Sequence, residues 1–132
     1  MASVMADVQF PSEYQQVMPY LLVTDPGALI DFMKVVMGAE EKMIMRDEDG
    51  TYRHCEMLVG KSVIMFSVSM QDWAPMPAGL FVYVADADAA YKKALEIGAT
   101  SLMPPGDQPY GRSCGVKDTN GNTWWLTTDK QS

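Results

Sequence analysis

His54 and Glu56 are the residues whose types and spacing most readily suggest chemistry. His54 is the only histidine of the chain, and Glu56 follows two residues later in a segment, 52–59, with the composition of a β-strand. Alternate residues of a strand point to the same face, so the imidazole and the carboxylate should lie together. Such a pair can transfer protons near neutral pH. It can also be purely structural, and we favour that interpretation because the sequence offers neither a nucleophile nor a metal motif beside it.

The two cysteines are the other candidates for reactivity. Cys55 and Cys114 occupy matching places in the segments "RHCEM" and "GRSCG". A nearby cation such as Arg112 can activate a thiol, but free cysteines are more commonly buried and inert, and we expect that state for both. Two cysteines do not form a disulfide framework, so we expect free thiols and a cytoplasmic location.

Three further side chains are candidates for ligand contacts. Tyr110 and Arg112 adjoin a segment rich in proline and glycine, residues 104–111, which we expect to be a loop. Arg112 can hold an anionic group or form a surface ion pair, and the acidic excess of the chain slightly favours the ion pair. Trp73 lies between the two halves of the chain, where it would cover a cavity, cover a dimer interface or simply pack.

The overall composition indicates one globular domain with an acidic surface. The 132 residues are 48% hydrophobic, and the net charge is −7 with a pI near 4.5. An acidic surface repels nucleic-acid phosphates and anionic lipids, so we expect neither as a partner. No apolar run reaches the ~20 residues of a membrane span. Residues 1–16 lack the features of a secretory signal, and we interpret them as a lead segment.

The elements that would position these side chains occur twice along the chain. Each half has a short apolar strand, an aspartate, an amphipathic helix that ends at Gly-Ala, and then three strands. Asp25 and Asp86 are suitable helix N-caps, and Gly38 and Gly98 suit the left-handed backbone at a helix end. The expected strands are 20–23, 41–47, 52–59 and 62–68 in the first half, and 80–84, 101–105, 112–118 and 123–128 in the second.

This arrangement resembles the vicinal oxygen chelate superfamily, which includes glyoxalase I, bleomycin-resistance proteins and extradiol dioxygenases; the PhnB-like branch is the most similar. The segments that carry the resemblance are 19–41, 54–65, 80–100 and 102–128. It implies an α+β fold of two βαβββ modules, residues 17–68 and 79–132, joined through a linker, residues 69–78, in one structural domain. It also implies a curved mixed sheet around a cavity, and a homodimer.

Metal-dependent members of that superfamily bind the metal through histidine and glutamate, or close substitutes, on the first and last strand of each module. The corresponding positions here are Tyr20, Ile64, Phe81 and Trp125, and none supplies a transition-metal donor. The resemblance therefore implies an aromatic cavity, and we expect neither a metal nor a cofactor. Trp124 and Trp125 are neighbours on a strand, so one should face the cavity and the other a helix.

The function that the resemblance implies is binding of a small apolar or aromatic molecule, of the glyoxalase/bleomycin-resistance type. The alternative is a metal-independent isomerase or lyase that uses His54 and Glu56 for proton transfer, and a third possibility is a fold used only for assembly. Whether any reaction is catalysed stays open at this point. The expected ligand-binding residues are Tyr20, His54, Glu56, Trp73, Phe81, Tyr110, Arg112 and Trp125, with His54 and Glu56 as the catalytic candidates.

Overall fold

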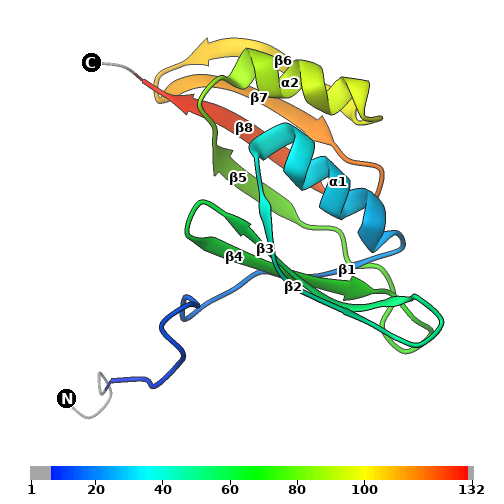
Figure 1. Cartoon of the computed structure of the whole chain (residues 1–132). Coiled ribbons are helices and arrows are strands. Elements are labelled where there is room, and N and C mark those ends of the chain that lie inside the picture. Colours follow the sequence, from blue (N-terminus) through cyan, green and yellow to red (C-terminus); the bar gives the residue numbers. More distant parts are fainter. Residues whose placement is uncertain (1–6, 131–132) are drawn as a thin grey trace.

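The computed structural model describes residues 7–130 as two four-stranded sheets with two helices (Figure 1). The first module contains β1 (Tyr20–Val23), α1 (Pro26–Met37), β2 (Glu40–Arg46), β3 (Tyr52–Val59) and β4 (Ser62–Val68). The second contains β5 (Gly79–Tyr83), α2 (Ala87–Glu96), β6 (Thr100–Gln108), β7 (Gly111–Lys117) and β8 (Thr123–Asp129). Residues 1–6 of the expected lead segment and residues 131–132 of the second module lie outside the described part of the chain.

Both sheets have the same mixed topology. Their strand orders are β1-β4-β3-β2 and β5-β8-β7-β6. The first strand of each module runs parallel to the last, and the remaining neighbours are antiparallel hairpins. Parallel strands cannot be joined by a tight turn, so the helix and two intervening strands make that connection. The predicted α+β fold of two βαβββ modules is therefore confirmed.

The helices begin and end where the sequence predicts. Asp25 Oδ1 accepts a hydrogen bond from Ala28 N, and Asp86 Oδ1 accepts one from Ala89 N, each at 3.1 Å. α1 ends at Gly38, whose φ of 67° is left-handed. Neither helix in residues 7–130 is long and apolar enough to cross a membrane.

Part of the expected loop at residues 104–111 is strand instead, because β6 continues to Gln108. β6 is the outermost strand of its sheet, where a proline without an N–H group breaks few ladder bonds. Pro104 and Pro105 fall in the register shift between Met103 and Gly106, a β-bulge after which pairing with β7 resumes. The composition correctly indicated irregular backbone but wrongly suggested the end of the strand.

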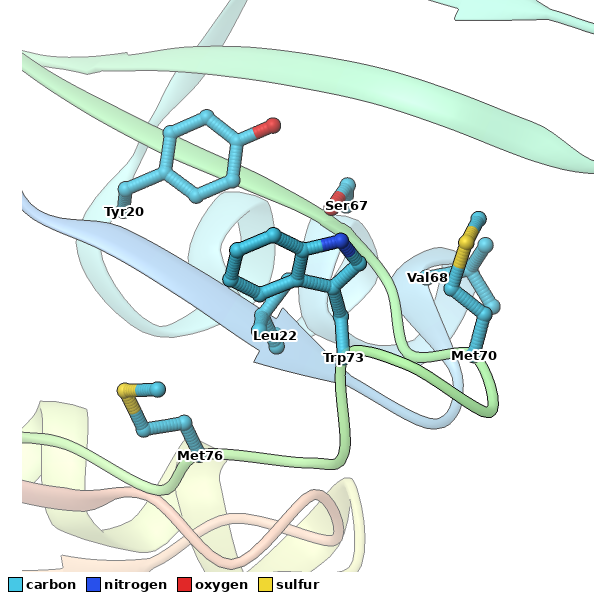
Figure 2. A pocket seen from close by; sticks show the side chains of 7 residues that line it. All are labelled: Tyr20, Leu22, Ser67, Val68, Met70, Trp73 and Met76. Atoms are coloured by element: carbon cyan, nitrogen blue, oxygen red, sulfur yellow. The ribbon is translucent and has the colours of Figure 1, made fainter.

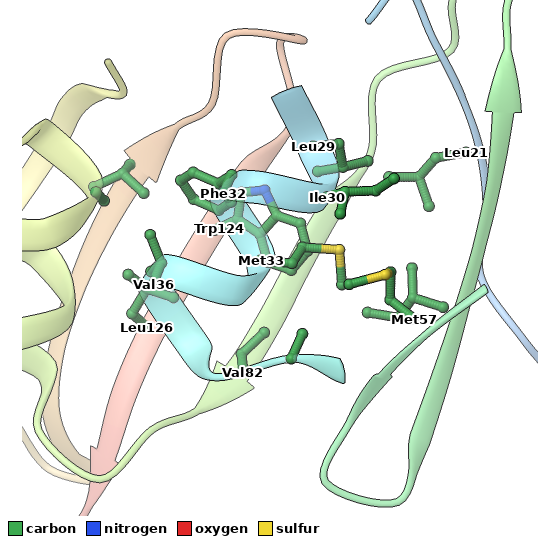
Figure 3. Close-up of a cluster of buried hydrophobic side chains, with 14 of the residues drawn as sticks. Leu21, Leu29, Ile30, Phe32, Met33, Val36, Met57, Val82, Trp124 and Leu126 are labelled. Carbon is green, nitrogen blue, oxygen red and sulfur yellow. The ribbon is translucent and has the colours of Figure 1, made fainter. Parts of the chain in front are cut away.

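The core is one cluster of buried apolar side chains that includes residues of both modules. Figure 3 shows α1 between the two sheets, with Met57 of the first sheet on one side and Trp124 of β8 on the other. The ring of Phe32 on α1 lies 5.6 Å from the Trp124 ring, centroid to centroid. α1 therefore connects the two modules through side-chain packing, whereas α2 packs on β6, β7 and β8.

Trp124 also determines the orientation of β8. Its Nε1 donates to Asp118 Oδ2 at 2.7 Å, and Asp118 Oδ1 accepts from the backbone of Asn120 and Asn122. This network satisfies the buried indole N–H, as such groups require. With Trp124 fully buried against the helices, the next residue, Trp125, emerges on the opposite face and is 41% exposed. Each sheet thus packs one face against a helix and turns its opposite face away from the helices.

Candidate functional site

The face of the first sheet opposite α1 carries a row of side chains across its four strands. Met65 of β4 is the register partner of both Tyr20 on β1 and Glu56 on β3, and Glu56 pairs in turn with Met43 on β2. The sequence placed Ile64 in this row, and that prediction is wrong by one residue. Ile64 belongs to the buried core cluster, because a shift of one residue moves a strand side chain to the other face.

A chain of polar groups crosses this open face. His54 Nε2 lies 2.8 Å from Glu56 Oε2, and because the carboxylate accepts, the imidazole N–H donates. His54 Nδ1 lies 3.3 Å from the hydroxyl of Tyr20. On the other side, Tyr14 donates its hydroxyl to Glu56 Oε1 at 2.6 Å. The structure thus brings His54 and Glu56 together as predicted, and adds Tyr14, which sequence reasoning missed.

Glu56 is a buried carboxylate whose pKa is nevertheless lowered, which favours its charged form. It is only 4% exposed, and this burial by itself raises the pKa of its carboxyl. The hydrogen bonds from Tyr14 and His54, with the electrostatic contributions of His54 and Lys42, outweigh the burial and place the pKa of Glu56 below its ordinary value. The same hydrogen bond raises the pKa of the Tyr14 phenol, so Tyr14 keeps its proton and acts as the donor.

A pocket of about 420 Å³ lies at the end of the first sheet, beside Tyr20 (Figure 2). Residues 69–78 form one wall of it: Met76 N donates to Leu22 O at 3.0 Å, and Met70 and Trp73 exchange two backbone hydrogen bonds in a tight turn. Trp73 is 62% exposed and stands in the middle of the lining side chains in Figure 2. The lining residues are Tyr20, Leu22, Ser67, Val68, Met70, Trp73 and Met76.

The second sheet carries an aromatic surface in place of the polar chain. Phe81 is the register partner of Trp125, and the Phe81 ring lies 6.1 Å from that of Tyr110. Gly79 makes room for the Trp125 indole, because a β-carbon there would lie 3.0 Å from Cζ3, whereas one at Gly115 would be in ordinary contact with the ring, 3.6 Å from Nε1. The indole therefore lies across the neighbouring strands, a role of glycine that the sequence analysis did not identify.

Three residues of interest lie away from these surfaces. Arg112 is at the surface beside α2, where it forms ion pairs with Asp88 and Asp107 at 3.3 Å. Cys55 and Cys114 are fully buried. Burial raises the pKa of Cys55 to about 11 and also raises that of Cys114, so both thiols are poor nucleophiles.

The residues at the family's metal positions do not fit a divalent metal. With the corrected register these are Tyr20, Met65, Phe81 and Trp125, which supply no imidazole, thiolate or carboxylate. Within residues 7–130, moreover, no group of three or more His, Cys, Asp or Glu side chains is arranged to hold a metal ion.

Comparisons with known proteins agree with this fold. The family model for the Glyoxalase/Bleomycin resistance protein/Dioxygenase superfamily matches residues 14–126. An uncharacterized protein of Mycobacterium tuberculosis, Rv0887c, is 28% identical over 120 residues, which cover 82% of this chain and 71% of the relative.

Solved structures are similar across most of the chain. TioX from Micromonospora sp. has a TM-score of 0.72 and 23% identity, over 88% of this chain and 99% of its own. TnmS3 of Streptomyces sp., described as an antibiotic binding protein, has a TM-score of 0.67 and 18% identity, over 89% and 100%. A PhnB protein from Bacillus cereus has a TM-score of 0.64 and 19% identity, over 86% and 99%.

The lowered pKa of Glu56 predicts a pH-dependent contribution to stability. A carboxyl whose folded pKa is depressed stabilises the fold above its ordinary pKa of 4.5, and that contribution is lost as the pH falls through the folded value. Glu56→Gln should lower the free energy of unfolding by about 1–3 kcal/mol at about pH 7, because it removes charge-assisted hydrogen bonds, and by less at about pH 3.

Urea unfolding of the wild type and the variant at both pH values measures this difference. Glu48→Gln, at an exposed carboxylate between β2 and β3, is the matched control and should change little at either pH. A Glu56→Gln penalty of equal size at both pH values would contradict the assignment.

Proposed function

The chain belongs to the Glyoxalase/Bleomycin resistance protein/Dioxygenase superfamily, and from this membership we propose that it binds a small apolar or aromatic molecule in the pocket of its first sheet. The observation that carries the proposal is the lining of that pocket. Its volume of about 420 Å³ is within the usual range for small-molecule sites. Leu22, Val68, Met70, Trp73 and Met76 supply apolar surface, whereas Tyr20 and Ser67 supply hydroxyl groups.

The composition of the lining supports a planar, largely apolar ligand. An exposed indole such as that of Trp73 offers a face for stacking on an aromatic ring. Thioethers such as those of Met70 and Met76 adapt to irregular shapes. Polar recognition would come from His54 and the buried carboxylate behind it, which the Tyr20 hydroxyl connects to the pocket. Binding in this form requires no metal ion, in keeping with the side chains at the family's metal positions.

The similarity to an antibiotic binding protein supports the same class of function at the level of the fold. TnmS3 has the same two-module architecture at 18% identity, so the likeness carries no ligand across to this chain. We propose only that this chain binds a small molecule of its own on the open face of its first sheet.

We also propose that the protein is a cytoplasmic homodimer. The aromatic surface formed by Phe81, Tyr83, Tyr110 and Trp125 is 41–63% exposed at each residue, and a second copy would cover it. Light scattering should give a mass of about twice 14.6 kDa, and Phe81→Asp should lower it toward that of one chain. A wild-type mass of a single chain at all concentrations would rule the dimer out.

A thermal-shift screen with aromatic metabolites and antibiotics tests the binding proposal. A compound present at about 100 times its Kd should stabilise the protein by ~2.7 kcal/mol and raise Tm by about 10 °C. Trp73→Ala should lose most of this shift, because it removes the stacking face in the pocket. Leu102→Ala, at an exposed apolar residue of β6 outside the pocket, should retain it. The absence of any stabilising compound, or an unchanged shift in Trp73→Ala, would contradict the proposal.

A second candidate is a metal-independent isomerase or lyase, favoured by the 2.8 Å separation of His54 Nε2 and Glu56 Oε2. In that case His54 would move a proton on the bound molecule while Glu56 holds its ring. His54→Ala should then lower turnover by about 10²–10⁴-fold and leave ligand affinity nearly unchanged. For this experiment the ligand from the screen is incubated with the protein, and its conversion is followed by NMR together with mass spectrometry, because an isomer has the same mass as the ligand. Intact ligand after incubation with the wild type would eliminate this candidate.

A further inference from the structure

Glu56 is buried although its two register partners on this face are exposed (Met43) or partly exposed (Met65). Its register partner Met43 on β2 is 42% exposed, whereas Glu56 itself is 4% exposed. The sheet alone therefore does not account for its burial. Tyr14 covers it: the hydroxyl reaches Glu56 Oε1 at 2.6 Å, and the ring lies 4.6 Å from Lys42 Nζ on β2.

The segment that carries Tyr14, residues 7–18, is attached to the sheet by neighbouring side chains, and the next residue, Pro19, joins the sheet through its backbone, where its carbonyl accepts from Met65 N at 3.0 Å. Besides Tyr14, Gln15 bonds through its amide to both backbone groups of Val63, at 2.8 Å and 3.2 Å, where β4 extends beyond the end of β1. On either side of these two contacts Phe10 and Val17 are exposed. The N-terminal segment, dark blue in Figure 1, extends outward from the first sheet. A segment held at so few points can open locally without unfolding the domain.

The surroundings of the Tyr14 ring have the chemistry of a ligand site. A carboxylate accepts the hydroxyl, and the Lys42 ammonium lies over the ring in a cation–π contact. Met43 and Met65 flank the carboxylate in the sheet register, and thioethers contact aromatic rings favourably. These groups would recognise any aromatic ring that bears a hydroxyl, because their contacts are to the side chain of Tyr14 and not to its backbone.

We propose that Glu56 is the centre of a subsite for a hydroxylated aromatic ring, and that Tyr14 occupies this subsite from within the chain until a ligand displaces it. The hydroxyl of the ligand replaces that of Tyr14 on Glu56 Oε1, while His54 stays on Oε2. Residues 7–18 then act as a strap that lifts from the sheet, while the backbone of Pro19 stays bonded to Met65. The subsite lies on the same open face as Tyr20, which borders the pocket. The identity of the physiological ligand rests on the proposed function, whereas the subsite itself can be tested without that ligand.

Displacement has a quantitative consequence. A ligand that binds only the open form shows an apparent Kd equal to its intrinsic Kd divided by the open fraction. The bond between Tyr14 and a buried carboxylate keeps that fraction small. Weakening the bond should therefore tighten the binding of an external phenol without any new contact.

Calorimetric and NMR titration with p-cresol, the Tyr14 side chain as a free molecule, tests the proposal. Tyr14→Ala should lower the apparent Kd for p-cresol by about tenfold or more relative to the wild type. Tyr14→Phe, which retains the ring but not the hydroxyl, should lower it by a smaller factor and serves if the alanine variant folds poorly. Tyr91→Phe is the matched control, because it removes a hydroxyl that bonds to Ser101 elsewhere, and it should leave the Kd unchanged.

Two further comparisons make the outcome decisive. Adding Glu56→Gln to Tyr14→Ala should remove the gain, and toluene, which lacks the hydroxyl, should show none. Trp73→Ala should preserve the gain, so a failure of the proposed pocket and a failure of this subsite give different results. Equal Kd values for p-cresol in the wild type, Tyr14→Phe and Tyr14→Ala would overturn the proposal, as would a gain that survives Glu56→Gln or is matched by toluene.

Discussion

The burial of the Trp124 indole against α1 is the interaction on which the two faces of the molecule depend. Asp118 holds Nε1 at 2.7 Å and Phe32 packs against the ring, so β8 has one orientation. The period of two in a strand then requires Trp125 to point away from the helices. The same reasoning applies to the first sheet, where the buried partners Leu21 and Phe66 alternate with residues of the open face. A helix packed between two sheets thus produces, on their other sides, the surfaces that a ligand can reach.

The two surfaces carry different side chains although the two modules have the same backbone topology. In the first module the row across the sheet contains Glu56, with His54 nearby, next to an apolar pocket. In the second module the matching place on the strand before the last is Gly115, the register partner of Trp125. One half therefore offers a charged hydrogen-bond acceptor and the other a flat aromatic surface. Tyr20, Met65, Phe81 and Trp125 carry no imidazole, thiolate or carboxylate, and the two surfaces present rings, thioethers and one carboxylate.

The sequence predicted the architecture well because the signals for it are local. Asp25 and Asp86 cap helices a few residues away, and the spacing of His54 and Glu56 is a property of a single strand. The sequence did not predict the register of the last strand of the first module. Ile64 was placed in the row of Met65 because a short apolar strand has no alternation that reveals its register.

Contacts between distant parts of the chain were not predictable from composition. Tyr14 meets Glu56 across 42 positions, and nothing in the polar lead segment marks that tyrosine as a contact. Gly79 looks like an ordinary strand glycine until the Trp125 ring is seen beside it. Arg112 was weighed as an anion contact or a surface ion pair, and its ion pairs with Asp88 and Asp107 depend on how α2 packs against β7.

Methyl NMR of the methionines tests most directly whether the pocket of the first sheet binds the ligand. Met70 and Met76 line the pocket, Met33 is in the core, and Met103 lies beside Gly115 on the second sheet. Titration with the aromatic compound that stabilises the protein most should shift the methyl resonances of Met70 and Met76 and leave those of Met33 and Met103 in place. Shifts at Met103 with no change at Met70 and Met76 would contradict binding in the pocket of the first sheet.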